Sequence, residues 1–157
     1  MYTHVTIILD KSGSMESVRD DTIGGFNSFL EEQKKVTGQC TVTLTMFNQH
    51  TVTPNYFASL HQITPLTRET YRPSGNTALL DAVGKTIDLT GNTLRDMLPY
   101  RRPEKVVFVG MTDGQENTSH RYTTTRVRDM IQHQQEKYKW EFVYLGSNQD
   151  AWLVARD

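Results

Sequence analysis

Short apolar runs along the chain alternate with longer stretches in which apolar positions recur at helical spacing. Residues 3–9 end in the continuous run Ile-Ile-Leu, and residues 105–111 contain the run Val-Val-Phe-Val. Continuous runs rich in β-branched side chains are typical of strands that are buried on both faces of a parallel sheet. We therefore expect two inner strands here, with the first of them at the centre of the sheet.

A hairpin is expected between residues 40 and 60. Residues 40–47 alternate small polar with apolar side chains, and a second strand pattern at residues 51–60 follows the short polar turn at residues 48–50. Pro54 lacks the N–H group that a central strand donates, so it marks the second of these strands as a sheet edge. Residues 140–145 are expected to add another short strand.

Helices are expected where apolar positions recur every three or four residues, at residues 17–35, 78–98, 123–137 and 148–157. Gly91 is a candidate break near the middle of the second of these helices, because glycine weakens a helix interior. Residues 64–76 are rich in Thr, Pro, Ser and Gly and are expected to form a surface loop.

Strands that alternate with helices predict an α/β fold. We expect a Rossmann-like, doubly wound, mostly parallel central sheet with one antiparallel edge strand and helices on both faces. At 157 residues the chain fits a single domain, over residues 1–157. Ligands of such sheets bind beyond the carboxyl ends of the strands, beside the point at which the strand order reverses. The ends of the two inner strands are therefore the expected place for a site.

Charge and cysteine content narrow the classes of partner. The 17 Lys and Arg residues nearly balance the 18 Asp and Glu residues, so no net field draws the chain to nucleic acid or to a membrane surface, and neither is an expected partner. The single cysteine, Cys40, cannot form an internal disulfide, and the N-terminus lacks the basic and apolar regions of a signal peptide. We therefore expect a cytoplasmic protein.

Oxygen-bearing side chains follow both inner strands. Asp10 ends the first apolar run and is followed by the hydroxyl groups of Ser12 and Ser14, while Asp113 follows the second run. Thr77, at the end of a Ser-Gly-Asn-Thr segment, can supply a third hydroxyl group. Hard cations such as Mg²⁺ bind oxygen ligands and keep several waters, so these residue types suit such an ion. With at most two carboxylates, the metal would keep positive character and room for another ligand.

These residues also carry a family resemblance. The order Asp-x-Ser-x-Ser at residues 10–14, then Thr77, then Thr-Asp-Gly at residues 112–114 resembles the metal-ion-dependent adhesion site of von Willebrand factor A domains, including integrin I domains. Three separated motifs in this order are far more specific than Asp-x-Ser-x-Ser alone. The sequence around residues 113–117 and 144–150 looks most like that of small bacterial or phage members of the family.

The resemblance implies a role for each motif residue. Ser12 and Ser14 would bind the metal directly, and Thr77 would bind it directly or through a water. Asp10 and Asp113 would act largely through waters or hydrogen bonds. Mg²⁺ is the expected ion, with Mn²⁺ or Ca²⁺ as alternatives, and the metal would capture an Asp or Glu side chain of a protein partner. The resemblance therefore implies a binding module and not an enzyme.

One departure from the family pattern concerns the end of the chain. Family members commonly continue to a sixth strand and a final helix, whereas the elements expected here end with residues 148–157. Two explanations stay open. The sequence is a truncated form, or its subfamily is naturally shorter and covers an exposed sheet edge by self-association.

Each motif residue also has a plainer interpretation. Ser12, Ser14 and Thr77 are of the types that cap helix N-termini, and Asp113 before a glycine is typical of a turn. An EF-hand also places ligands at the spacing of the first motif, but Met15 stands where that loop needs glycine. Capping alone leaves the order of the three motifs unexplained.

An enzymatic alternative is a metal-dependent phosphohydrolase of the haloacid-dehalogenase-like type, which also places a nucleophilic Asp at the end of its first strand, as Asp10 is placed. Such an enzyme has a second acid two residues later, where this chain has Ser12. A third alternative is a metal that only ties the three loops together. Glu116 is expected to be a solvated acid outside the metal shell.

Overall fold

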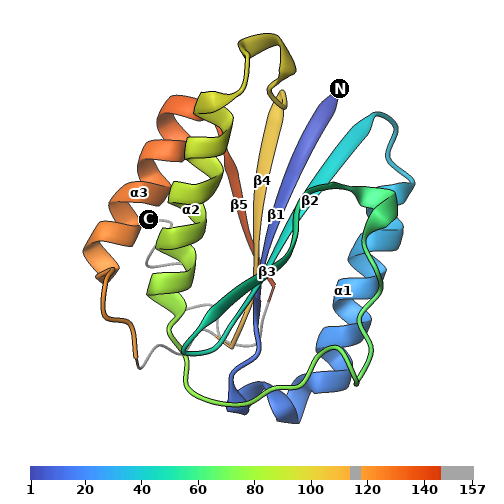
Figure 1. Ribbon diagram of the computed structural model, residues 1–157, viewed down its shortest axis with the longest axis vertical. Coiled ribbons are helices and arrows are strands. Elements are labelled where there is room, and N and C mark those ends of the chain that lie inside the picture. The colour runs from blue at the N-terminus through green and yellow to red at the C-terminus, as the bar shows by residue number, and fades with distance from the viewer. Residues whose placement is uncertain (114–117, 146–157) are drawn as a thin grey trace.

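A five-stranded sheet forms the centre of the computed structural model, which describes residues 1–113 and 118–145 (Figure 1). The strand order is β3-β2-β1-β4-β5, with bounds Tyr2–Asp10 for β1, Gln39–Phe47 for β2, Thr51–Ser59 for β3, Lys105–Met111 for β4 and Glu141–Leu145 for β5. Only the β2–β3 pair among these strands is antiparallel, and β3, which contains Pro54, lies at the edge. The expected sheet, its central first strand and its antiparallel edge are confirmed.

Helices cover both faces of the sheet, as expected (Figure 1). Helix α1 lies on one face, whereas α2 and α3 lie side by side on the other, with bounds Arg19–Lys34 for α1, Leu79–Asp96 for α2 and Thr124–Tyr138 for α3. In the described residues, three short 3₁₀ helices join these elements: η1 at Gly13–Val18, η2 at Leu60–Gln62 and η3 at Pro99–Arg101. The first α-helix thus begins later than the residue 17 expected from the pattern, because 3₁₀ turns take up residues 13–18.

The expected break at Gly91 is wrong. Helix α2 continues through this residue to Asp96, and its buried face includes Val83, Ile87 and Thr90. A glycine in a helix interior costs only about 0.5–1 kcal/mol relative to alanine, which is less than the contribution of one well-buried aliphatic side chain, about 1.5–3 kcal/mol. Packing on the sheet therefore keeps the helix continuous.

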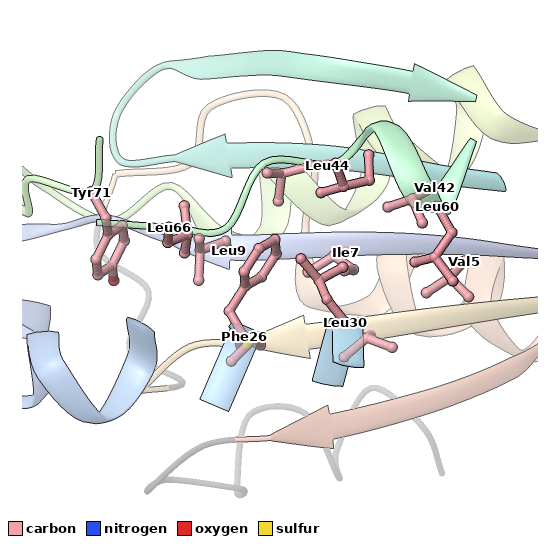
Figure 2. Packing of buried hydrophobic residues seen from close by; sticks show 13 residues of the cluster. Val5, Ile7, Leu9, Phe26, Leu30, Val42, Leu44, Leu60, Leu66 and Tyr71 are labelled. Carbon is pink, nitrogen blue, oxygen red and sulfur yellow. The ribbon is translucent and has the colours of Figure 1, made fainter. Parts of the chain in front are cut away.

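Two hydrophobic clusters hold the layers together. Between the sheet and the α2–α3 pair, the buried aromatic residues are Phe47, Phe108, Trp140 and Phe142. Between the sheet and α1, Phe26 and Leu30 pack on β1 and β2 residues such as Ile7 and Leu44 (Figure 2). Phe29 is partly buried at the margin of this second cluster.

The loop between η2 and α2 is also part of the core. It forms no helix, but Ile63, Leu66 and Tyr71 are buried in the α1-side cluster, and Figure 2 shows Leu66 and Tyr71 beside Leu9. The Asn27 side chain on α1 fixes the loop by accepting the N–H of Leu66 at 2.8 Å and donating to its carbonyl at 3.0 Å. Most residues at 64–76 are exposed, as expected of a surface loop, but Leu66 and Tyr71 turn inwards and close the end of the core.

Two sequence expectations fall outside the described residues, namely the helix at residues 148–157 and the solvated position of Glu116. Within the described part of the chain, no helix combines the length and the apolar character needed to cross a membrane.

Candidate metal centre

The candidate site lies where β1 and β4 end. The two strands are parallel neighbours, with Leu9 opposite Met111, so that Asp10 and Thr112 leave the sheet side by side. β1 is also the point at which the strand order reverses, because the chain continues from β1 to β2 on one side and reaches β4 on the other. This is the position at which open α/β sheets bind their ligands.

Asp10 is fully buried and fixes two of the loops. Its Oδ1 accepts the N–H of Ser12 at 2.8 Å, and its Oδ2 accepts the hydroxyl of Thr112 at 2.7 Å. Burial raises the pKa of Asp10 above its usual value, the hydrogen bonds from Ser12 and Thr112 oppose this rise, and the charge of Asp113 adds to it. The buried carboxylate of Asp10 therefore holds the loops of the site in place, and a nearby cation would stabilise its charged form.

The two serine hydroxyl groups point to the same place. Ser12 Oγ and Ser14 Oγ lie 3.3 Å apart, and Ser14 Oγ donates a short hydrogen bond to Asp113 Oδ2. Ser12 is buried whereas Ser14 is exposed, so the pair leads from the interior to the surface. Asp10, Ser12, Ser14 and Asp113 are thus linked by direct contacts, although Asp113 is 99 residues from Ser14 in sequence.

Helix capping does not account for these hydroxyl groups. Ser12 is at the N-cap position of η1, but its side chain makes no capping hydrogen bond, and α1 begins only after Val18. The N-cap position of α2 is Ala78 and not Thr77, and a free N–H group in the first turn, that of Asp81, donates to the hydroxyl of Ser119. The plainer interpretation of Ser12 and Thr77 as N-caps is therefore not supported.

The loop that carries Thr77 is held against the first loop by its backbone. Gly13 N–H donates to the carbonyl of Gly75 at 2.9 Å, and Ser74 N–H donates to the carbonyl of Lys11 at 2.8 Å. Gly75 has φ +84°, a backbone conformation that favours glycine, and a Cβ atom there would also force the side-chain amide of Gln49 to shift. These contacts bring Thr77, which is 3 % exposed, to the same rim as the serines.

Two residues that support the site were not predicted from the sequence. Tyr71, which is fully buried, donates its hydroxyl to the carbonyl of Asp10 at 2.5 Å, across 61 residues. The side-chain amide of Asn48 donates to the carbonyl of Ser74 at 3.0 Å, and the backbone carbonyl of Asn48 accepts the N–H of Ala78 at 2.9 Å. No periodicity joins these residues to the motifs, so only the fold reveals them.

The donors suit a hard cation. Three hydroxyl groups and two carboxylates supply oxygen only, which is the chemistry that Mg²⁺, Mn²⁺ and Ca²⁺ prefer. Among the described residues, no cluster of three or more His, Cys, Asp or Glu side chains has the arrangement of a metal site.

Similar solved structures identify the fold. The manganese-loaded TRAP protein of Plasmodium vivax is 17 % identical over 98 % of this chain and 62 % of its own, with a TM-score of 0.66. The ArnB paralog VWA2 from Sulfolobus acidocaldarius is 18 % identical over 98 % of this chain and 38 % of its own, with a TM-score of 0.59. A von Willebrand factor type A structure from Catenulispora acidiphila is 13 % identical over 92 % of this chain and 33 % of its own, with a TM-score of 0.56.

These identities are low, so the likeness concerns the fold and not the activity. This chain spans between 33 % and 62 % of the length of these three structures. No protein-family model matches the sequence, and no curated protein matches it.

Proposed function

From the premise that the chain has a von Willebrand factor A fold, we propose that it is a metal-dependent protein-binding module. The module holds a divalent cation with five residues, Asp10, Ser12, Ser14, Thr77 and Asp113. The expected ion is Mg²⁺, with Mn²⁺ or Ca²⁺ as alternatives. An Asp or Glu side chain of a protein partner completes the coordination. The observation that carries the proposal is the convergence of the serine hydroxyl groups with the two carboxylates at the ends of β1 and β4.

Charge explains why the partner should be acidic. Two carboxylates and three hydroxyl groups give the protein side of the site a charge of no more than −2, and Asp10 is buried beneath the rim. In the proposed arrangement the carboxylates act largely through waters or hydrogen bonds and not as direct ligands, so the cation keeps positive character on its open side. A carboxylate from a partner is a hard, negative oxygen ligand and fits that position.

The same donors argue against an enzyme. A metal-dependent hydrolase pairs its ion with a general base or a nucleophile, and a phosphohydrolase of the haloacid-dehalogenase-like type needs an acid where this chain has Ser12. The manganese in the TRAP structure supports a divalent cation in this fold. We therefore propose binding without turnover.

The first test is isothermal titration of the metal-stripped protein with Mg²⁺ and Mn²⁺. We expect saturable binding that is lost in Asp10→Ala/Ser12→Ala. The matched control is Ser28→Ala/Asp96→Ala, which removes the same side-chain types from exposed positions and should bind as the parent does. Circular dichroism checks that each variant is folded. Equal affinity in the parent and in Asp10→Ala/Ser12→Ala would overturn the assignment of the site.

The second test addresses the acidic ligand. With saturating Mg²⁺, the peptide acetyl-Gly-Glu-Gly-amide should shift the amide NMR signals of residues 12–14, and the glutamine analogue should not. Removal of the metal with a chelator should abolish the effect. Equal shifts from both peptides would show that no carboxylate completes the metal site.

A further inference from the structure

Asp81, in the first turn of α2, binds the segment that follows the third motif. Its two carboxylate oxygens accept three consecutive backbone N–H groups, each at 2.9 Å, from His120, Arg121 and Tyr122. The N–H group of Asp81 donates to Ser119 Oγ at 3.0 Å. One side chain and its own backbone thus hold four consecutive residues of a segment that lies about 40 positions further along the chain.

Asp81 does not act as an ordinary helix-terminal acid. Acidic residues in a first turn commonly interact with the N–H groups and the dipole of their own helix, whereas this carboxylate binds N–H groups of another segment. Partial burial acts to raise the pKa of Asp81, but the three N–H groups outweigh it, and the pKa lies below its usual value. The side chain is therefore ionised at neutral pH, and its hydrogen bonds are charge-assisted.

The contact extends along one stripe of α2. The ring of Tyr122 packs on Gly84, where a Cβ atom would overlap with it, and the hydroxyl of Tyr122 donates to Asp88 at 2.8 Å. The guanidinium of Arg126 lies over the same ring, 4.4 Å from its centre. Asp81, Gly84 and Asp88 are spaced by three and four residues, so they share one face of the helix.

The contacts of Asp81 with residues 119–122, which we call the anchor, lie directly beside the proposed metal site. Thr118 N–H donates to the carbonyl of Thr77 at 3.2 Å, four residues before Asp81. At the other end of the loop, Thr112 is held by Asp10, and its carbonyl accepts the hydroxyl of Tyr144 at 2.8 Å. Helices α2 and α3 both start at the end of the molecule where β1 and β4 stop (Figure 1). The loop that carries Asp113 is thus held on both sides.

We propose that Asp81 is a positioning residue for the metal site, because it fixes the far end of the Asp113 loop on the start of α2, next to Thr77. This inference rests on the proposed function. It predicts that Asp81→Asn weakens metal binding although Asp81 is not itself a ligand. The expected loss of metal affinity is about tenfold, the lower end of the range for residues that orient metal ligands without binding the metal themselves.

The test is titration with Mg²⁺ and Mn²⁺ of Asp81→Asn beside Asp88→Asn, with circular dichroism as a check of folding. Asp88→Asn removes the same charge from the same helix stripe, but Asp88 accepts the hydroxyl of Tyr122 and not the backbone N–H groups of residues 120–122, so the metal affinity of this variant should match the parent. An equal loss in both variants would mean that the charge of α2 matters and not the anchor, and would overturn the inference. Unchanged affinity in Asp81→Asn would overturn it as well.

A double-mutant cycle separates positioning from general stability. If Asp81 acts through the Asp113 loop, Asp81→Asn should have little further effect in an Asp113→Asn background, whereas an independent effect would repeat the full tenfold loss. If Asp81→Asn does not fold, Ser119→Ala removes one of the same contacts and should weaken metal binding to a smaller degree, and an unchanged affinity there would overturn the inference. A parent chain that binds no metal would overturn the proposed function itself.

Discussion

Tyr71 is the largest fully buried side chain in the described part of the chain, and its hydroxyl group ends beneath the candidate site. It joins the loop between η2 and α2 to the last residue of β1. Burial, together with the nearby charge of Asp10, raises the pKa of Tyr71 well above its usual value, so the hydroxyl stays a donor at any working pH. A single residue therefore couples the packing of the core to the position of Asp10.

Tyr71→Phe should lower the free energy of unfolding by about 1–2 kcal/mol, because it leaves the buried Asp10 carbonyl without this donor. Urea denaturation measures the change. Tyr100→Phe is the matched control, since Tyr100 is 79 % exposed, and it should stay within about 0.5 kcal/mol of the parent. Equal stability of Tyr71→Phe and the parent would show that water replaces the lost donor.

His4 makes stability depend on pH. The ring is fully buried, stacks on Phe57 at 3.8 Å, and contacts the hydroxyl groups of Thr41 and Thr6 at 2.8 and 3.2 Å. Burial lowers the pKa of His4 to about 3 from an ordinary value of 6.5. Between these values the unfolded chain binds the proton that the folded chain excludes, so this contribution to stability is complete above pH 6.5 and is lost as the pH falls towards 3.

We expect His4 to make the free energy of unfolding fall by up to about 1.4 kcal/mol per pH unit below pH 6.5. Urea denaturation at a series of pH values measures the slope. His4→Gln should flatten it, whereas His61→Gln, at an exposed position, should leave it unchanged. The same slope in His4→Gln as in the parent would assign the acid sensitivity to other groups.

At the scale of elements, helix α2 shows how packing decides what a residue contributes. Gly91 and Gly84 lie in the same helix, and both carry the same intrinsic cost. Nothing lies closer than 4.0 Å to a Cβ atom built at Gly91, whereas one at Gly84 would overlap with the ring of Tyr122. Sequence periodicity treats the two glycines alike and thus could not tell the tolerated one from the required one.

The two glycines should respond in opposite directions to alanine. Gly91→Ala should raise the free energy of unfolding by about 0.5–1 kcal/mol through helix propensity. Gly84→Ala should lower it by about 1–3 kcal/mol, because Asp81 holds the backbone of Tyr122 and limits how far the ring can shift. Thermal unfolding of both variants measures the difference, and stabilisation by Gly84→Ala would contradict the packing of Tyr122 on α2.

For the whole molecule, the sheet was predictable because β1 and β4 contain continuous apolar runs and β2 alternates small polar with apolar side chains. The nearness of Asp10 and Asp113 was predictable because Asp10 ends β1 and Asp113 lies two residues beyond the end of β4. What the sequence could not show are polar contacts between distant segments, such as Tyr71 with Asp10 and Asp81 with residues 120–122. Periodicity reports on one element at a time, whereas these contacts depend on how three loops meet at the end of the sheet.

Because the three loops meet around Asp10, the proposed cation should stabilise the whole domain. At a free Mg²⁺ concentration 100 times Kd, the gain is about 2.7 kcal/mol, since the ion binds the folded and not the unfolded chain. For a domain of this size the melting temperature should rise by about 5–10 °C, as measured by calorimetry with Mg²⁺ and then with a chelator. Asp10→Ala/Ser12→Ala should show no such rise. An equal rise in melting temperature in this variant would place the ion elsewhere. If the melting temperature of the parent rises but the parent does not respond to the glutamate peptide, the metal ties the loops together and does not capture a partner.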